Sequence, residues 1–234
     1  MFAWKNKMSL VCCCADPPPP PTNTTQDLLN MELVDGRTGA STTWRESCSN
    51  QACIVVWTRN FAWVAGELQS AYYAAVTPLL QKHNIKLVFI NTAIFAQSEI
   101  YLARYEEYAP FPGTLLLDSK KATHHHFGFQ YGIFRSLIPP ILLGVPKYGI
   151  YGAIRGAILG FKNFSLAGSS WQQGGTAVVL KNGSITFINQ EQHPADFAPL
   201  EQVLHSAGVP KNEIPINIEP SNELLKFLNS KRKK

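Results

Sequence analysis

The feature that most restricts the fold of this 234-residue chain is a series of short apolar segments that alternate with helical ones. Segments that are apolar throughout and rich in β-branched residues are typical of buried strands. Because helices separate them, they predict a parallel arrangement covered on both faces, and so an α/β protein. The strands are predicted at 53–58, 86–91 and 114–118, and the helices at 66–83, 95–108 and 120–127.

Hairpins are predicted on either side of this alternating region. The first lies within 31–44, where Asp35-Gly36 is a turn dipeptide. The second joins strands 176–180 and 184–189 through the turn Lys-Asn-Gly, and a helix at 199–207 follows it. Alternating strands and helices closed by a hairpin and a helix are the element order of a thioredoxin-like fold. We therefore expect a central mixed sheet flanked by helices.

The domain organisation is predicted from changes in composition. Five consecutive prolines (Pro17–Pro21) predict an extended, disordered tail over residues 1–30. The thioredoxin-like domain is predicted over 31–209, and residues 210–234 form a tail with one short helix and a basic end.

Residues 131–175 are predicted to be a segment inserted into this domain. Prolines and the charges of Lys147 and Arg155 interrupt its apolar stretch, which is too broken for a membrane-spanning helix. Packing over the domain edge is favoured, and interfacial membrane contact is the alternative.

The distribution of charge along the chain does not favour a nucleic acid as a partner. The net charge is +5, but the terminal Lys231–Lys234 supply four of these charges, so the rest of the chain is close to neutral. No basic surface interleaved with aromatic residues is evident, and such a surface would be needed for nucleic-acid binding. The basic end is a solvated tail or a weak patch for peripheral membrane contact.

The cysteine pattern indicates a reducing compartment. The chain has five cysteines, Cys12, Cys13, Cys14, Cys48 and Cys53, an odd number that does not describe a secreted disulfide framework. A cytoplasmic location is therefore expected. The triplet beside an apolar N-terminus is a candidate for S-palmitoylation and membrane association, whereas a disordered tail with unmodified thiols is the simpler interpretation.

Four motifs together resemble the peroxiredoxin-like 2 family, the AhpC/TSA antioxidant-enzyme-domain proteins. They are VVWTRNFAWVAGEL (55–68), LLLD (115–118), WQQGGTAVVLKNGSITFIN (171–189) and DFAPLEQVLHSAGV (196–209). The resemblance covers about 33–209 and implies a thioredoxin-like fold. It also implies thiol-dependent antioxidant or prostaglandin-reducing activity.

The resemblance further implies a C-x-x-C pair at the start of the helix after the first central strand. There the first thiol gains a lowered pKa at the helix N-terminus and attacks, and the second resolves the mixed disulfide. The matching positions here are Ala62 and Ala65, so the redox pair is absent from this chain. Natural loss in a paralogue and engineered replacement both explain this. Cys53 is expected to be a buried apolar side chain at the far end of the strand, and Cys48 lies further back.

Two other classes of function stay open. One is a non-redox binding or regulatory protein with a pocket for an anionic or partly apolar small molecule. The other is a non-redox enzyme that uses Glu67 or His193 as proton carrier. Whether the chain is an enzyme, and its oligomeric state, are not determined by the sequence. The predicted pocket residues are Thr58, Arg59, Trp63, Glu67, Gln173, Gly174, Gly175 and Thr176.

Two of these residues have competing explanations. Arg59 ends a strand, where its guanidinium either holds a ligand carboxylate or phosphate or forms a salt bridge of the fold. Glu67 on the first helical turn is explained by the helix dipole alone.

No metal and no cofactor are expected. His124, His125 and His126 are adjacent and point in different directions on a helix, so they cannot chelate one ion together. A mixed surface and helix-end role is predicted for them, and pairing of one with Asp118 is an unspecific alternative. No Walker loop, G-x-S-x-G or G-x-G-x-x-G motif is present.

Overall fold

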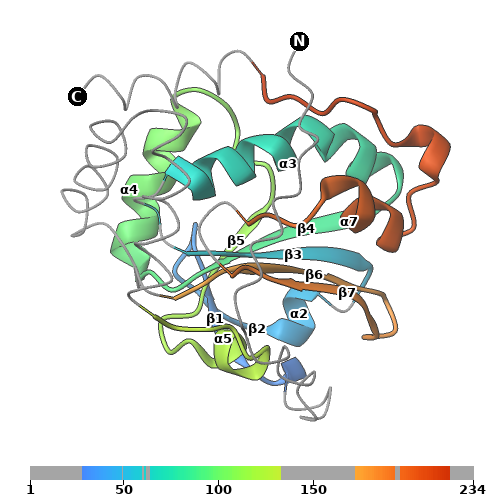
Figure 1. The fold of residues 1–234 in the computed structure, drawn as a ribbon. Coiled ribbons are helices and arrows are strands. Elements are labelled where there is room, and N and C mark those ends of the chain that lie inside the picture. Colours follow the sequence, from blue (N-terminus) through green and yellow to red (C-terminus); the bar gives the residue numbers. More distant parts are fainter. Residues whose placement is uncertain are drawn as a thin grey trace.

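The computed structural model describes residues 28–48, 50–59, 61, 64–132, 172–192 and 196–221. One seven-stranded sheet dominates them, with the order β2-β1-β5-β4-β3-β6-β7 (Figure 1). The strands are β1 (Glu32–Asp35), β2 (Ser41–Thr43), β3 (Ala52–Thr58), β4 (Ile85–Asn91), β5 (Thr114–Leu117), β6 (Gly175–Val179) and β7 (Ile185–Gln190). The helices are α2 (Trp44–Cys48), α3 (Val64–Lys82), α4 (Phe95–Glu106), α5 (Ala122–His126), α7 (Leu200–Ser206) and the 3₁₀ helix η2 (Lys211–Glu213).

The sheet is mixed, as predicted. The three central strands β3, β4 and β5 are parallel, because a helix connects each to the next. Strand β1 is antiparallel to β5 and to β2 on one side, and β6 is antiparallel to β3 and to β7 on the other. The predicted closing hairpin and helix are β6, β7 and α7.

Local side-chain bonds explain both hairpin turns. In the first, Asp35 Oδ1 accepts the backbone N–H groups of Arg37 and Thr38 at 2.9 and 2.8 Å. In the second, Asn182 Oδ1 accepts the N–H of Ser184 at 3.0 Å, and Gly183 has φ of 83°, a conformation that glycine adopts without strain.

Each face of the sheet buries its own core. Helices α3, α4 and α7 cover one face, whereas α2 and α5 lie on the other (Figure 1). Alternate residues of β3 serve the two cores, since successive side chains of a strand point to opposite faces. The first core includes Ile54, Val56, Tyr73, Leu80, Phe89, Tyr105 and Leu204, and the second includes Trp44, Cys53, Val55, Trp57, Ile90 and Phe127.

The main discrepancies from the sequence-based expectations are short elements. Helix α2 and the 3₁₀ helix η2 were not predicted, because segments of five and three residues carry no readable periodicity. The proline-rich tail, most of the predicted insertion and the terminal helix lie outside the described residues. Among the described residues, no helix is long and apolar enough to cross a membrane.

Candidate functional site

At the carboxyl ends of the parallel strands β3 and β4, just before helix α3, polar side chains form hydrogen bonds between the strands. Thr58, the last residue of β3, is paired in register with Asn91, the last residue of β4. Asn91 Nδ2 donates to Thr58 Oγ1 at 2.9 Å, and Thr58 Oγ1 donates to the carbonyl of Ile90 at 3.3 Å. The Thr58 hydroxyl, a predicted pocket group, therefore holds the carboxyl ends of two strands together.

Arg59 follows Thr58 and is buried, with 5% of its surface exposed. Its Nε donates to the carbonyl of Gln172 at 3.1 Å, so the guanidinium braces the segment before β6. Burial lowers the pKa of Arg59 to about 10, because the charged form loses water, and attraction to Glu191 opposes this shift.

Hydrogen bonds to residues 129 and 130 hold the Gln172-Gln173 segment in place. Gln172 Nε2 donates to the backbone carbonyls of Phe129 and Gln130 at 3.1 and 3.2 Å. The backbone N–H of Gln173 donates to the same carbonyl of Gln130 at 2.9 Å. Both glutamines are buried. The wall of the site is therefore an ordered set of amides held against residues 129–130.

Glu191 is the central acidic group of this wall. It follows β7 directly and is 2% exposed. Gln69 Nε2 donates to its Oε1 at 3.2 Å, and the N–H of Glu191 donates to the carbonyl of Gly174 at 3.1 Å. Burial raises the pKa of Glu191 to about 8, although the Arg59 charge and the Gln69 hydrogen bond oppose the shift. Burial thus favours the protonated form of this carboxyl group at neutral pH.

Gly174 makes room for Glu191. A Cβ built on Gly174 would lie 2.3 Å from the carbonyl oxygen of Trp57 and 2.9 Å from Glu191 Oε2. Any side chain at this position would therefore displace the strand end or the carboxyl group.

Glu191 and Gln69 are not among the predicted pocket residues. Strand β7 was predicted to stop at residue 189, one residue before its end. The hairpin register pairs Gly175 with Gln190, which places Glu191 opposite Gly174. Extending the predicted hairpin by two residues would have placed this acid in the site.

Three further predicted residues are also buried in the described part of the chain. Glu67, in the first turn of α3, is 1% exposed, so its carboxyl group faces the protein interior. Thr176 is fully buried, and burial raises the pKa of the neighbouring Tyr73 hydroxyl. Gly175 has no space for a side chain, because a Cβ would lie 2.6 Å from both Asn189 O and the Phe129 ring.

The turn itself is not covered by the structure. Ala62, Trp63, the side chain of Ala65 and His193 lie outside the described residues. The Cys12–Cys14 triplet does as well. Their predicted roles therefore remain predictions.

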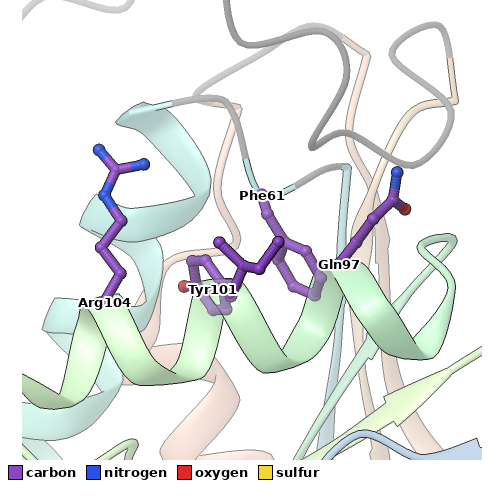
Figure 2. A pocket seen from close by; sticks show the side chains of 5 residues that line it. Phe61, Gln97, Tyr101 and Arg104 are labelled. Atoms are coloured by element: carbon purple, nitrogen blue, oxygen red, sulfur yellow. The ribbon is translucent and has the colours of Figure 1, made fainter.

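A small surface pocket lies between Phe61 and helix α4 (Figure 2). The ring of Phe61, one residue before Ala62, stacks on Tyr101 of α4 with centroids 4.2 Å apart and an interplanar angle of 11°. Ile100 of α4 is 51% exposed. The pocket thus offers apolar surface and one cation, and its lining is Phe61, Gln97, Ile100, Tyr101 and Arg104.

The predicted surface role of the histidines is wrong for two of them. His124 and His126 are buried and only His125 is exposed. His124 Nδ1 contacts Asp118 Oδ2 at 3.3 Å, so the Asp118 pairing is confirmed. Helix α5 is a single turn packed against the sheet, and a run of identical polar residues does not reveal which ones face inward.

Solved structures with the same fold are peroxide-reducing proteins by name. Peroxidoxin BcpB from Mycobacterium tuberculosis superposes with a TM-score of 0.54 at 12% identity, covering 80% of this chain and 96% of that one. The bacterioferritin comigratory protein of Xanthomonas campestris gives 0.52 at 11% identity, covering 81% and 94%. The fold is therefore the thioredoxin-like fold of peroxiredoxins.

Sequence comparison defines the family. The profile of the AhpC/TSA antioxidant enzyme family matches residues 73–193. The prostamide/prostaglandin F synthase of Homo sapiens is 30% identical over 173 residues, 71% of this chain and 78% of that protein. That of Bos taurus is 28% identical over 193 residues, 80% and 89%. The chain belongs to the AhpC/TSA antioxidant enzyme family. The profile match begins after residues 62–65.

Proposed function

We propose that this protein is a small-molecule-binding member of the AhpC/TSA family that does not carry out a thiol redox cycle at the start of α3. One observation carries the proposal. The buried polar wall next to the turn is complete, with Arg59, Glu67, Gln173 and Glu191 all enclosed, whereas positions 62 and 65 are alanine. A site that has these polar residues but no cysteine at positions 62 and 65 can bind a ligand, but it cannot exchange electrons with that ligand through thiols at the start of α3.

The missing chemistry follows from the side chain of alanine. A peroxide is reduced when a thiolate attacks its O–O bond and a second thiol releases water from the sulfenic acid. A methyl group can form neither thiolate nor disulfide. The first turn of any α-helix presents the positive end of the helix dipole, which favours an anionic or oxygen-rich group.

The ligand class follows from the surfaces around the turn. Arg59 and Glu67, which precede and follow the turn in sequence, belong to the buried polar wall, and the Phe61 pocket offers an aromatic stack and Arg104 (Figure 2). A molecule with an oxygenated or carboxylate head and an apolar portion is complementary to both. The relatives named prostamide/prostaglandin F synthase are consistent with a ligand of this kind.

The redox part is tested by restoring the sulfurs. Peroxide reduction with dithiothreitol or thioredoxin is measured for a Cys53→Ser form of the chain, which has no thiol in β3 to attack the peroxide, and for the Ala62→Cys/Ala65→Cys variant of that form. We expect multiple turnovers in the variant only, and Ala62→Cys/Ala65→Ser is the control for a missing resolving thiol. Multiple turnovers by the Cys53→Ser form with alanine at both positions would refute the proposal.

The binding part is tested with prostaglandin F as probe. We expect it to raise the melting temperature in a concentration-dependent way and to be recovered chemically unchanged. Arg104→Gln should weaken this stabilisation, whereas Lys120→Gln, a cation exposed near β1, should leave it intact. An unshifted melting temperature at saturating probe would count against a ligand of this class.

A non-redox enzyme is the second candidate, and Glu191 favours it. A protonated carboxyl group beside a buried arginine is a suitable general acid. In this case the probe would be converted, and Glu191→Gln would abolish conversion while preserving the thermal shift. Glu67 and His193 stay as the other candidate proton carriers.

A further inference from the structure

Two buried thiols lie at the opposite end of β3 from the candidate site. Cys48 is the last residue of α2 and Cys53 the second residue of β3, with 2% and 0% of their surfaces exposed. Cys53 Sγ donates to the carbonyl of Cys48 at 3.4 Å, and the two thiols hydrogen-bond each other. Cys53 and Arg59 are six residues apart in an extended strand, about 20 Å. The pair is therefore separate from the α3 turn.

The surroundings make the two thiols unequal. The hydrogen bond from Cys48 lowers the pKa of Cys53, and the Lys86 charge lowers it further, whereas burial opposes the shift. The same hydrogen bond, together with burial, raises the pKa of Cys48. Lys86 is paired in register with Cys53, and its Nζ donates to the carbonyl of Ser47 at 2.8 Å, which fixes the ammonium beside the pair. Cys53 is thus the thiolate-forming member, and Cys48 keeps its proton.

Access to the pair depends on a short element. Helix α2 has five residues, and helices of this length have little stability of their own. Trp44, at its other end, anchors it by stacking on Trp57 with centroids 5.7 Å apart. Access for an oxidant of a few atoms therefore requires only local opening at the Cys48 end of α2, on the side away from this anchor.

We propose that Cys48 and Cys53 form a dithiol centre that a hydroperoxide converts reversibly to an intramolecular disulfide. The Cys53 thiolate attacks the O–O bond, which breaks to give Cys53 sulfenic acid, and the leaving oxygen takes a proton as alcohol or water. The Cys48 sulfur then attacks the sulfenic sulfur, the S–S bond forms, and its proton leaves with the hydroxyl as water. The sulfurs lose two electrons to the peroxide, and a dithiol such as dithiothreitol returns them.

The test uses the full chain with hydrogen peroxide as probe. The reduced protein is oxidised under native conditions, denatured, alkylated, digested and mapped by mass spectrometry. We expect alkylation of both Cys48 and Cys53 to be lost together, a peptide pair joined through them to appear, and dithiothreitol to restore both alkylation sites. Mapping distinguishes them from Cys12, Cys13 and Cys14.

Two variants assign the roles of the thiols. Cys48→Ser should accumulate a Cys53 sulfenic acid that dimedone traps, and Cys53→Ser should leave Cys48 alkylated after the same treatment. If both residues of the unchanged protein stay alkylated, or if the disulfide joins two chains, the proposal is overturned. Because the mapping is made on the unchanged protein, misfolding of a variant does not affect this decision.

Discussion

Gln69 Nε2 donates a 3.2 Å hydrogen bond to Glu191 Oε1 and so joins helix α3 to the end of strand β7 inside the protein. The bond joins residues 122 positions apart in the sequence and holds the Glu191 carboxyl group beside Gly174 and Arg59. A buried acid in this position makes the stability of the fold depend on pH.

Replacing Glu191 should remove part of that pH dependence. The pKa of Glu191 is about 8 in the folded protein and near 4.5 when the chain is unfolded. Between these values the unfolded state releases a proton that the folded state keeps, so the free energy of unfolding falls as pH rises, by about 1.4 kcal/mol per pH unit. Urea unfolding at several pH values should give a smaller fall for Glu191→Gln.

The matched control is Glu99→Gln on the exposed side of α4. It should keep the slope of the unchanged protein, because Glu99 is in contact with solvent. Identical slopes for the Glu191 variant and the unchanged chain would show that the carboxyl group is ionised, and the proton-carrier role would fail with it.

The space at Gly174 gives a second prediction. The Cβ of an alanine there would lie 2.3 Å from the Trp57 carbonyl oxygen, so the end of β3 or the segment before β6 must shift. Such overpacking typically costs about 1–3 kcal/mol of unfolding free energy. Gly132→Ala is the control, since a Cβ at Gly132 would meet no atom within 4 Å. Equal denaturation midpoints for the two variants would contradict the packing described at this site.

The sequence predicted the fold well because the sheet follows from local patterns. The apolar runs of β3, β4 and β5 and the turn residues Asp35 and Asn182 determine strands and hairpins within a few residues of chain. The family motifs then located the wall of the site at Arg59 and the Gln172-Gln173 segment.

The rest depends on contacts between distant segments, which no local pattern reveals. Glu191 is in the site because β7 runs one residue further than its apolar pattern indicates, and because Gly174 leaves room for it. Likewise, the proximity of Cys48 to Cys53 arises from a one-turn helix that propensity cannot detect. The predicted exposure of the histidines was wrong for the same reason. Three adjacent histidines suggest a surface position, but His124 contacts Asp118 and Phe129 inside the protein.

The hydroxyl of Thr123 gives the last prediction, because it links β3 to α5. It accepts a 2.9 Å hydrogen bond from Trp57 Nε1 and donates to Asp118 Oδ2, the carboxylate that caps the start of α5. Thr123→Val keeps the shape but leaves the fully buried indole N–H without its acceptor, a loss of about 1–3 kcal/mol in unfolding free energy. Thr186→Val, which removes an exposed hydroxyl bonded to Ser206 O, should cost about 0.5 kcal/mol or less. Chemical denaturation followed by tryptophan fluorescence measures both, and a Thr123 variant as stable as the Thr186 variant would show that the Trp57 bond contributes nothing.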